Sequence, residues 1–457
     1  MPQRAAAQAP LDSLRASVTL FGAAGSGEDL PFWLAANQHG RVDPASANAG
    51  LRLEAHRPFA GTDGLDYAVG VEVLGRASRH STATFHQLYG QVRYWKLRLT
   101  AGRRAQSVGR VDRSLSVGST THSCNAPPLP RISIASDGYV AVPGTGERLA
   151  LKGALSHGWM GTDRVVEGAY VHEKSLYARF LPPAFPVNAY AGITHHVQWG
   201  GTHPEEGPQQ ASLARWADVL VGNEVVVEGP RTDSPTFNPN HLAMYDFSLG
   251  ADLGGARARV YRQFYHEDIA SFNFRNVWDG LWGVSLRREE SGALVDGILW
   301  EHLRMTRHNA RFSAGEERGS DSYYNHSRYE SGWTYQGRTL GTPLLTPAAT
   351  TPGTNDAAIG VANNIVVAHH VGVEGHLGAR LSYEALGTYS RNYGAQSRCG
   401  PCDYGRTDRR DQYSVRLAVR GPLPGRPDLR VRAAAALDTG EFYDERIGLL
   451  LALTWRR

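Results

Sequence analysis

Apolar and polar side chains alternate along many stretches of this chain, and this pattern constrains its fold most strongly. One such stretch runs from Leu429 to Asp438, with Leu429 and Val431 on one face of an extended strand and Arg430 and Arg432 on the other. Similar stretches occur at 51–56, 97–101, 246–253 and 413–420. A sheet made of such strands has an apolar face and a polar face, and each face needs its own environment. A membrane-spanning β-barrel supplies both environments.

The size and hydropathy of the chain fit a single large sheet. The chain has 457 residues, and its Pro/Gly-rich patches at 341–354 and 421–427 lie between strand-like segments, so we interpret them as loops. The longest apolar run, Ile447 to Leu453, is far shorter than the roughly twenty residues of a membrane-spanning helix. We therefore expect a single-domain, all-β membrane protein over residues 30–457, built as a large antiparallel transmembrane barrel with outer-membrane lipid around it.

Composition and charge agree with this interpretation. The 51 glycines and the 30 tyrosines and tryptophans suit tight turns and interfacial aromatic bands, although a soluble β-sandwich has similar counts. The net charge of +4 comes from 48 basic and 44 acidic residues that are interspersed along the chain. Because no basic patch stands out, we predict no nucleic-acid partner.

The first 29 residues are predicted to be a lead-in that precedes the barrel. They begin MPQRAAAQAPLD, in which Ala7-Gln8-Ala9 has the small-x-small form of a signal cleavage site. No apolar core precedes this site, so an Ala-rich disordered terminus is the alternative. We interpret the segment as the remnant of an export signal.

Two stretches interrupt the strand pattern and are predicted to plug the barrel. Residues 105–146 are rich in Ser, Gly and Pro and are too long for a simple turn. Within the second stretch, 203–222, Leu213, Trp216 and Leu220 recur at helical spacing and predict a short amphipathic helix. At the end of the chain, Leu449, Leu451, Leu453 and Trp455 share one face, as expected of a closing strand with Trp455 near the membrane interface.

Motifs for catalysis, cofactors or metal ions are weak. Cys399-Gly-Pro-Cys402 has the spacing of a thioredoxin-like dithiol, but strand-like segments flank it, so we interpret Cys399 and Cys402 as a candidate disulfide in a loop. The paired histidines, such as His195-His196, would point to opposite faces of a strand and cannot chelate one ion. We predict no enzyme, no cofactor and no metal site.

One segment combines aromatic and polar side chains in a way that suits sugar binding, because aromatic rings stack on sugar C–H faces and planar polar groups bond hydroxyls. This segment, 325–345, reads NHSRYESGWTYQGRTLGTPLL. The candidate residues are Arg328, Tyr329, Trp333, Tyr335, Gln336 and Arg338. The alternative interpretation is an aromatic girdle combined with charges that line the lumen.

Several blocks together resemble the Wzi family of capsule assembly proteins. They include LPFWLAANQHGRV at 30–42, QLYGQVRYWKLRLTAGRR at 87–104, SVGSTTHSCNAPPLPRI at 116–132, GWMGTDR at 158–164, VHEKSLYARF at 171–180 and GITHHVQWGG at 192–201, as well as the segment at 325–344. The resemblance runs from about residue 30 to the C-terminus.

The resemblance implies a barrel of roughly eighteen strands in the bacterial outer membrane, with helical segments closing the periplasmic end and loops folding over the outer end. It also implies a non-enzymatic, lectin-like protein that attaches or organises capsular polysaccharide or exopolysaccharide at the cell surface, with the polysaccharide export machinery as a further candidate partner. Asn37, Gln38 and His39 form a second candidate group for sugar binding. We expect Arg430 and Arg432 to line the lumen, with sugar bound at the loops rather than along that wall.

Two other functions compete with this hypothesis. A diffusion porin needs an open lumen, and an outer-membrane hydrolase needs a catalytic Ser or His. Steady conductance across a bilayer would favour the porin, whereas turnover of lipid or glycan would favour the hydrolase.

Overall fold

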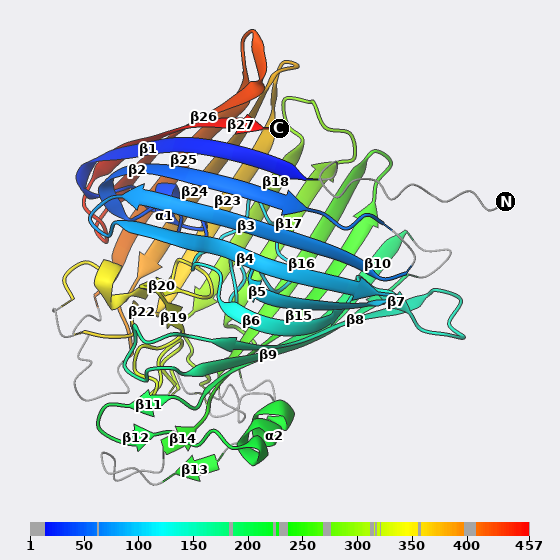
Figure 1. The fold of residues 1–457 in the computed structure, drawn as a ribbon. Helices are drawn as coiled ribbons and strands as arrows, with labels where there is room; N and C mark the ends of the chain where they lie inside the picture. The colour runs from blue at the N-terminus through cyan, green and yellow to red at the C-terminus, as the bar shows by residue number, and fades with distance from the viewer. Residues whose placement is uncertain are drawn as a thin grey trace.

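The computed structural model describes most of the chain. The described residues are 14–61, 64–181, 186–222, 225–227, 236–267, 276–310, 315, 318–319, 321–354, 358–396 and 408–456. In these residues a single antiparallel sheet closes on itself and forms a barrel (Figure 1).

Eighteen strands form the wall of the barrel, and each pairs with the next wall strand along the chain. They are β1 (Arg15–Asp29), β2 (Ala45–Arg57), β3 (Asp66–Ala77), β4 (Thr82–Tyr94), β5 (Leu97–Arg103), β6 (Pro130–Ser136), β8 (Leu149–Trp159), β9 (Tyr170–Phe180), β10 (Val187–Trp199), β15 (Asn240–Asp252), β16 (Ala256–Glu267), β17 (Gly280–Arg288), β18 (Gly297–Met305), β23 (Val366–Leu377), β24 (Leu381–Asn392), β25 (Arg410–Leu423), β26 (Arg426–Gly440) and β27 (Arg446–Arg456). The two-residue strand β7 (Val140–Ala141) pairs with β8. The predicted barrel of about eighteen strands is confirmed.

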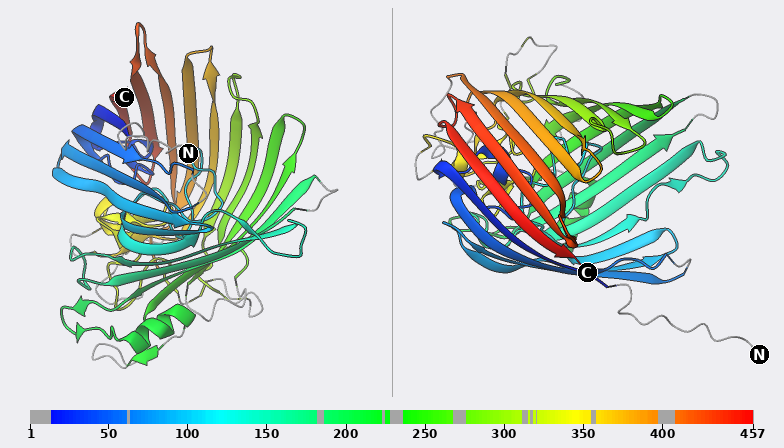
Figure 2. Two further views of the ribbon diagram at one scale, coloured as in Figure 1. Left: turned by 45° about the vertical axis from the view of Figure 1, so that its right-hand side comes forward. Right: turned by 90° about the horizontal axis from the view of Figure 1, so that it is seen from above.

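The first and last strands close the wall. β1 pairs antiparallel with β27 from Ser17↔Arg456 to Gly25↔Gly448, and it pairs on its other side with β2. Figure 2 shows the strands tilted around a central space, with the first and last strands side by side. This pairing closes the described wall without a free edge strand, which is a requirement for a sheet surrounded by lipid.

The apolar face of the sheet points outward. On β27, the side chains of Ile447, Leu449 and Leu451 are 59%, 59% and 61% exposed, whereas the intervening Leu450 is 4% exposed. A soluble protein would bury such a continuous apolar face, so this arrangement is typical of a wall that contacts lipid. The predicted outward face of the last strand is confirmed.

Exposed aromatic side chains gather near both ends of the wall, as in membrane-interface bands. At the end where β1 begins and β27 ends, these are Tyr67, Tyr94, Trp95 and Trp455, and near the opposite end they are Phe85, Trp159, Trp278 and Trp282. Trp455 therefore lies where the sequence predicted it.

The two ends of the barrel differ in the length of their connections. At the end where β1 begins and β27 ends, several strands are joined by tight turns, such as Trp95-Lys96 and Pro424-Gly425. At the other end the connections include 30–44, 104–129, 200–239 and 306–365. In outer-membrane barrels short turns are periplasmic and long loops are extracellular. We name the two ends the periplasmic end and the outer end accordingly.

Both α-helices of the described residues lie in connections at the outer end. They are α1 (Phe32–Ala35), between β1 and β2, and α2 (Leu213–Val221), between β10 and β15. The expectation that helical segments close the periplasmic end is therefore wrong for the described part of the chain. Neither helix is long and apolar enough to span a membrane.

The barrel begins earlier than the predicted boundary at residue 30. Residues 15–29, which we assigned to the lead-in, form the complete strand β1. The strand was missed because small residues from Gly22 to Gly27 hide its alternation, although Leu20 points outward and Thr19 inward. The proposed export-signal remnant at 1–13 lies outside the described residues.

The described residues of three outer connections, 30–44, 104–129 and 306–365, fold into the barrel and interlock there, and we call them the loop cap. Segment 104–129 is held by the inner wall, where Glu301 of β18 accepts hydrogen bonds from the Ser116 hydroxyl and the Val117 N–H, both at 2.7 Å. On β23, His370 Nε2 lies 2.6 Å from the Leu115 carbonyl oxygen. The cap and the inner wall share the largest apolar cluster, which includes Trp33, Leu115, Tyr323 and Trp333.

The predicted plug at 105–146 is only partly correct. Its first part enters the barrel, but Pro130–Ser136 forms wall strand β6. Ile132 and Ile134 of this strand face outward and are 50% and 47% exposed. The alternation spans only seven residues in a Ser- and Pro-rich region, which is too short to stand out in the sequence.

The predicted helix in 203–222 exists, but it does not plug the barrel. Helix α2 begins after Ser212, whose side chain accepts the Arg215 N–H, and it ends at Gly222 in the left-handed conformation. Val219 packs with Val197 and Trp199 on the outer face of β10, and Figure 1 shows the helix outside the wall. The amphipathic pattern predicted the helix correctly but could not tell which side of the wall the helix covers.

The remaining elements are short and lie in the outer connections. They are β11 (Thr202–His203), β12 (Gly207–Pro208), β13 (Val225–Val227), β14 (Thr236–Asn238), β19 (Thr334–Tyr335), β20 (Arg338–Thr339), β21 (Thr346–Pro347), β22 (Val361–Asn363) and the 3-10 helix η3 (Ala348–Thr350).

Candidate functional site

The aromatic residues of the first predicted group are buried in the loop cap. Trp333 has no exposed surface, and its indole N–H donates a hydrogen bond to the Thr121 carbonyl oxygen at 2.6 Å. Its ring packs against His196 of the wall at 5.5 Å between ring centroids. Tyr329 is equally buried, and burial raises the pKa of its hydroxyl. Both side chains therefore stabilise the cap, and sugar binding by either remains a prediction.

Arg328 and Tyr335 also act within the cap. The Arg328 guanidinium is buried and contacts a Glu206 carboxylate oxygen at 2.7 Å. The Tyr335 hydroxyl accepts a hydrogen bond from Arg103, the last residue of β5, at 2.9 Å. Each side chain thus links segment 325–345 to another part of the outer end.

Arg338 joins the two predicted groups. Its guanidinium donates to the Ala35 carbonyl oxygen at 3.1 Å and to the Val42 carbonyl oxygen, and burial lowers its pKa to about 10. Asn37, Gln38 and His39 lie between these two acceptors, so the structure brings the groups into one cap. In contrast, Gln336 is exposed at the turn between β19 and β20.

The second predicted group lies beside a cavity. Asn37 and Gln38 line it, and Asn37 Nδ2 donates to the Ser116 carbonyl oxygen at 3.4 Å. The His39 N–H donates to the Cys124 carbonyl oxygen at 2.6 Å, which connects the first two segments of the cap. Burial and then the charge of Arg41 lower the pKa of His39 to about 3, so this imidazole is neutral at pH 7.

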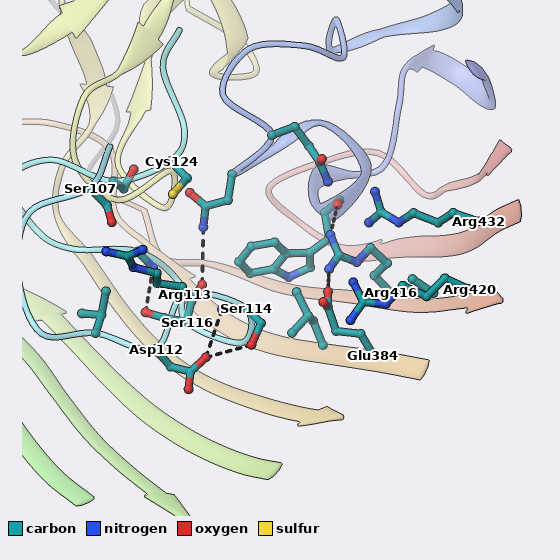
Figure 3. Close-up of a pocket in the computed structure, with 18 of the residues that line it drawn as sticks. Ser107, Asp112, Arg113, Ser114, Ser116, Cys124, Glu384, Arg416, Arg420 and Arg432 are labelled. Carbon is teal, nitrogen blue, oxygen red and sulfur yellow. Dashed lines mark hydrogen bonds and ion pairs between the residues drawn. The ribbon is translucent and has the colours of Figure 1, made fainter. Parts of the chain in front are cut away.

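This cavity has a volume of about 270 Å³ and lies between the loop cap and the wall. The cap side contributes serines, Asp112 and Cys124, whereas the wall contributes Glu384, Arg416, Arg420 and Arg432 (Figure 3). Figure 3 shows the three arginines extending from neighbouring strands toward the cap. Polar groups from two sides converge here, as in a site for a polar ligand.

A second cavity, of about 210 Å³, adjoins the first and shares Gln38, Arg420 and Arg432 with it. We call it the arginine chamber because six arginines line it: Arg41, Arg52, Arg420, Arg430, Arg432 and Arg456. No Asp or Glu is among its lining residues in the described part of the chain. A third cavity, of about 500 Å³, shares Arg420, Arg430 and Arg456. The predicted lumenal position of Arg430 and Arg432 is confirmed.

The alternating stretches of the sequence contain Arg52, Arg420, Arg430 and Arg432, but their pattern did not predict that these arginines converge. Register brings them together, because Arg430 pairs with Thr454, Thr454 with Thr19, and Thr19 with Arg52 across four strands. Alternation predicted that Arg52 and Arg430 lie on polar faces. The pairing of β1 with β27 brings Arg52 and Arg430 into the same cross-strand row of the wall. This pairing could not be predicted from local sequence pattern.

In the described residues, one side-chain cluster has the composition of a metal site. Ligand atoms of His122, Glu173 and His196 lie within 4.8 Å of one another. However, the Arg131 guanidinium contacts the same carboxylate, and a cation beside it would be repelled. We interpret the cluster as a hydrogen-bonded anchor between cap and wall. The adjacent His195 points to the outer face, where it bonds His241 at 2.9 Å, so the two histidines of this pair face opposite sides as predicted.

The cysteines add no catalytic centre to the described structure. The candidate disulfide between Cys399 and Cys402 lies outside the described residues. Cys124 is a free thiol that is partly buried at the 270 Å³ cavity, and burial raises its pKa. A raised pKa keeps the thiol protonated and weakly nucleophilic at neutral pH.

Comparisons with known proteins identify the family. The family described as "Capsule assembly protein Wzi" matches residues 34–350, which is more than two-thirds of the chain. Among solved structures, the Escherichia coli protein Wzi is described as an outer membrane protein involved in group 1 capsule assembly and as a carbohydrate-binding β-barrel. It is 16% identical, with a TM-score of 0.62, and the match covers 97% of this chain and 84% of that one.

A looser match is the Pseudomonas aeruginosa outer membrane protein OpdK. It has 9% identity and a TM-score of 0.48, and the match covers 98% of this chain and 99% of that chain. No curated protein sequence matches the chain significantly. From the family match, supported by the closed barrel and its loop cap, we conclude that the chain belongs to the Wzi family of capsule assembly proteins.

Proposed function

We propose that this protein is a non-enzymatic, lectin-like barrel of the outer membrane that attaches or organises capsular polysaccharide or exopolysaccharide at the cell surface. The observation that carries this proposal is the family match over residues 34–350, which contains most of the first cap segment, the whole of the second and most of the third. The description of Escherichia coli Wzi as a carbohydrate-binding barrel supports the same ligand class. The polysaccharide export machinery is a further candidate partner.

The cap geometry separates the predicted site residues into residues that stabilise the cap and residues that can contact sugar. We propose that Arg328, Tyr329, Trp333, Tyr335 and Arg338 hold the shape of the cap, because their side chains are largely engaged in contacts within the protein. Gln336, at an exposed turn, and Asn37 and Gln38, at the 270 Å³ cavity, remain the proposed sugar contacts. Amide side chains suit this role because each offers both donors and an acceptor to hydroxyl groups.

Binding of native polysaccharide by the purified protein tests this proposal. The full-length protein in detergent is passed over immobilised surface polysaccharide from the source strain, with neutral dextran as the control polymer. We expect retention on the native polymer only, and weaker retention for the Gln336→Ala variant. Lack of binding to the native polymer would contradict a lectin-like role.

The same preparation separates the two rival functions. A hydrolase would shorten the polymer during incubation, whereas we expect its size distribution on gel filtration to stay unchanged. A porin would give large, steady currents in a planar bilayer, whereas we expect the cap to keep the conductance small. Shortened polymer or a porin-like current would favour the respective rival.

A further inference from the structure

The arginine chamber contains positive charge that the protein does not neutralise. Within the described residues, no Asp or Glu oxygen lies within 4.0 Å of a guanidinium nitrogen of the five wall arginines, which are Arg52, Arg420, Arg430, Arg432 and Arg456. Arg41, from the cap, differs because Glu72 binds it through both carboxylate oxygens at 2.6 and 2.7 Å.

The acidic residues of the adjoining cavities are already engaged elsewhere. Asp112 and Glu374 both pair with Arg287, Glu384 pairs with Arg416, and Asp296 pairs with His376. These pairs leave no lining carboxylate to neutralise the wall arginines. Charges of one sign in a partly enclosed cavity focus a positive field and raise the local concentration of anions.

Local geometry makes the unliganded chamber unfavourable. Arg420 and Arg432 are direct cross-strand partners in the register of β25 and β26, and like charges in this position repel. Arg52 Nε is buried without a hydrogen-bond partner, and Arg52 Nη2 has only a long contact, 3.4 Å, to the Thr19 hydroxyl. A bound anion would relieve the repulsion and supply the missing acceptor.

The lining also indicates the class of anion. Guanidinium groups bind carboxylate and phosphate through paired hydrogen bonds. Thr19, Thr454 and Gln38 lie among the arginines and can bond hydroxyl groups. Because the arginines continue into the neighbouring cavities of about 270 and 500 Å³, the lining suits an extended ligand with several anionic groups better than a single small ion.

The chamber lies toward the periplasmic end of the barrel. Arg456 is the last residue of β27, and Arg430 and Arg432 follow the periplasmic turn between β25 and β26. The loop cap covers the opposite side of the same cavities, through Gln38, Arg41 and Val42. A ligand therefore reaches the chamber most directly from the periplasmic side.

We propose that the arginine chamber is a second glycan site, which binds carboxylate or phosphate groups of an acidic polysaccharide segment from the periplasmic side. This inference rests on the proposed function, because it assumes that the glycan handled by the barrel is acidic. It differs from sugar binding at the exposed turn of the cap in its location, in its charge requirement and in its dependence on salt.

Calorimetric titration of the full-length protein in detergent tests the chamber. The probes are tetragalacturonate, neutral maltotetraose, monomeric galacturonate and inorganic phosphate. The test variant is Arg430→Gln/Arg432→Gln. The matched control is Arg426→Gln, because Arg426 lies in the same hairpin but is exposed and paired with Asp428 at 3.1 Å.

We expect tetragalacturonate to bind the wild-type protein, and the double variant to raise its Kd about tenfold or more through the loss of two charge-assisted contacts. The Arg426→Gln variant should leave the Kd unchanged, and maltotetraose should not bind. Raising the salt to about 0.3 M should weaken the binding of tetragalacturonate. The ligand-free double variant should melt no lower than wild type, because it has lost a repulsive pair.

Several results would overturn the chamber proposal. These are an unchanged Kd in the double variant, equal binding of maltotetraose, a lower melting temperature of the ligand-free double variant, or phosphate or galacturonate binding as tightly as the tetramer. If tetragalacturonate does not bind but the native polysaccharide is still retained, the chamber proposal is wrong and the proposed function stands. If tetragalacturonate binds in the chamber but the native polysaccharide is not retained, the chamber proposal stands and the proposed function is wrong.

Discussion

Trp333 shows how one residue type supports two interpretations in a sequence. An aromatic side chain among polar groups fits both a sugar platform and a packing residue, and burial decides between them. In the structure Trp333 is fully buried between the cap and His196. Gln336, three residues later, is exposed at the turn between β19 and β20. The sequence pattern gave both residues as sugar-binding candidates and did not distinguish them.

Replacing Trp333 with alanine tests its structural role. Removing the ring leaves a cavity and an unpaired Thr121 carbonyl oxygen, and we expect the cap to lose about 3–5 kcal/mol of stability. Limited proteolysis should then cut within 104–129 or 306–365 faster than in wild type. Gln336→Ala, which removes an exposed side chain, is the control and should leave the cleavage rate unchanged. Equal rates for both variants would contradict the packing role of Trp333.

His39 gives the cap a predictable pH dependence. Burial and then the charge of Arg41 lower its pKa from 6.5 to about 3 in the folded state. Below pH 6.5 the unfolded cap therefore binds a proton that the folded cap does not. The stability that the folded cap gains from a neutral His39 is complete above pH 6.5 and is lost progressively as the pH falls toward 3.

The variant His39→Asn checks this dependence. Asn tolerates the positive φ of 53° at this position and does not titrate. We expect the melting temperature of wild type to fall more steeply between pH 7.5 and 5 than that of the variant, as measured by tryptophan fluorescence in detergent. Parallel pH curves for the two proteins would contradict the assigned cause.

At the level of elements, segment 104–129 is fixed to the inner side of the wall. Its contacts run to several wall strands, including Glu301 on β18 and His370 on β23, and Asp246 on β15 accepts the Arg110 N–H at 2.7 Å. Because the anchors are distributed around the wall, the segment is fixed from several directions. Glu301 is central, since the Tyr261 hydroxyl also donates to it.

The Glu301→Ala variant should loosen this segment. It leaves buried donors of Ser116, Val117 and Tyr261 unpaired, each at a cost of about 1–3 kcal/mol. We expect more frequent and larger channel openings in planar bilayers than for wild type. The control is Glu289→Ala, which breaks an exposed pair with Arg257 that contributes little to stability. Unchanged conductance in Glu301→Ala would show that other anchors suffice.

Local pattern predicted wall strands with long, regular alternation but not the elements that depend on context. Strand β27 was predictable because its alternation is long and its apolar residues are large. In contrast, β1 is rich in Gly and Ala, and β6 has only seven residues, so each lacks a clear signal. Helix α2 was predicted, but its position outside the wall depends on long-range contacts with β10. The arginine chamber could not be predicted from local pattern either, because strand register and barrel closure bring its arginines together.

The whole molecule has three concentric layers between the lipid and the lumen. An apolar outer face contacts lipid, a hydrogen-bonded wall separates lipid from lumen, and a loop cap with arginine-lined cavities fills the interior. This arrangement agrees with the proposed role in attaching polysaccharide at the cell surface.

The most direct test of this role is to delete the gene from the source strain and to measure where its surface polysaccharide goes. Cell-associated and released polymer are quantified separately, with a complemented strain as the control. We predict that polymer shifts from the cells to the medium while the total amount and chain length stay unchanged. An unchanged distribution, or a loss of total polymer, would contradict a function in attachment.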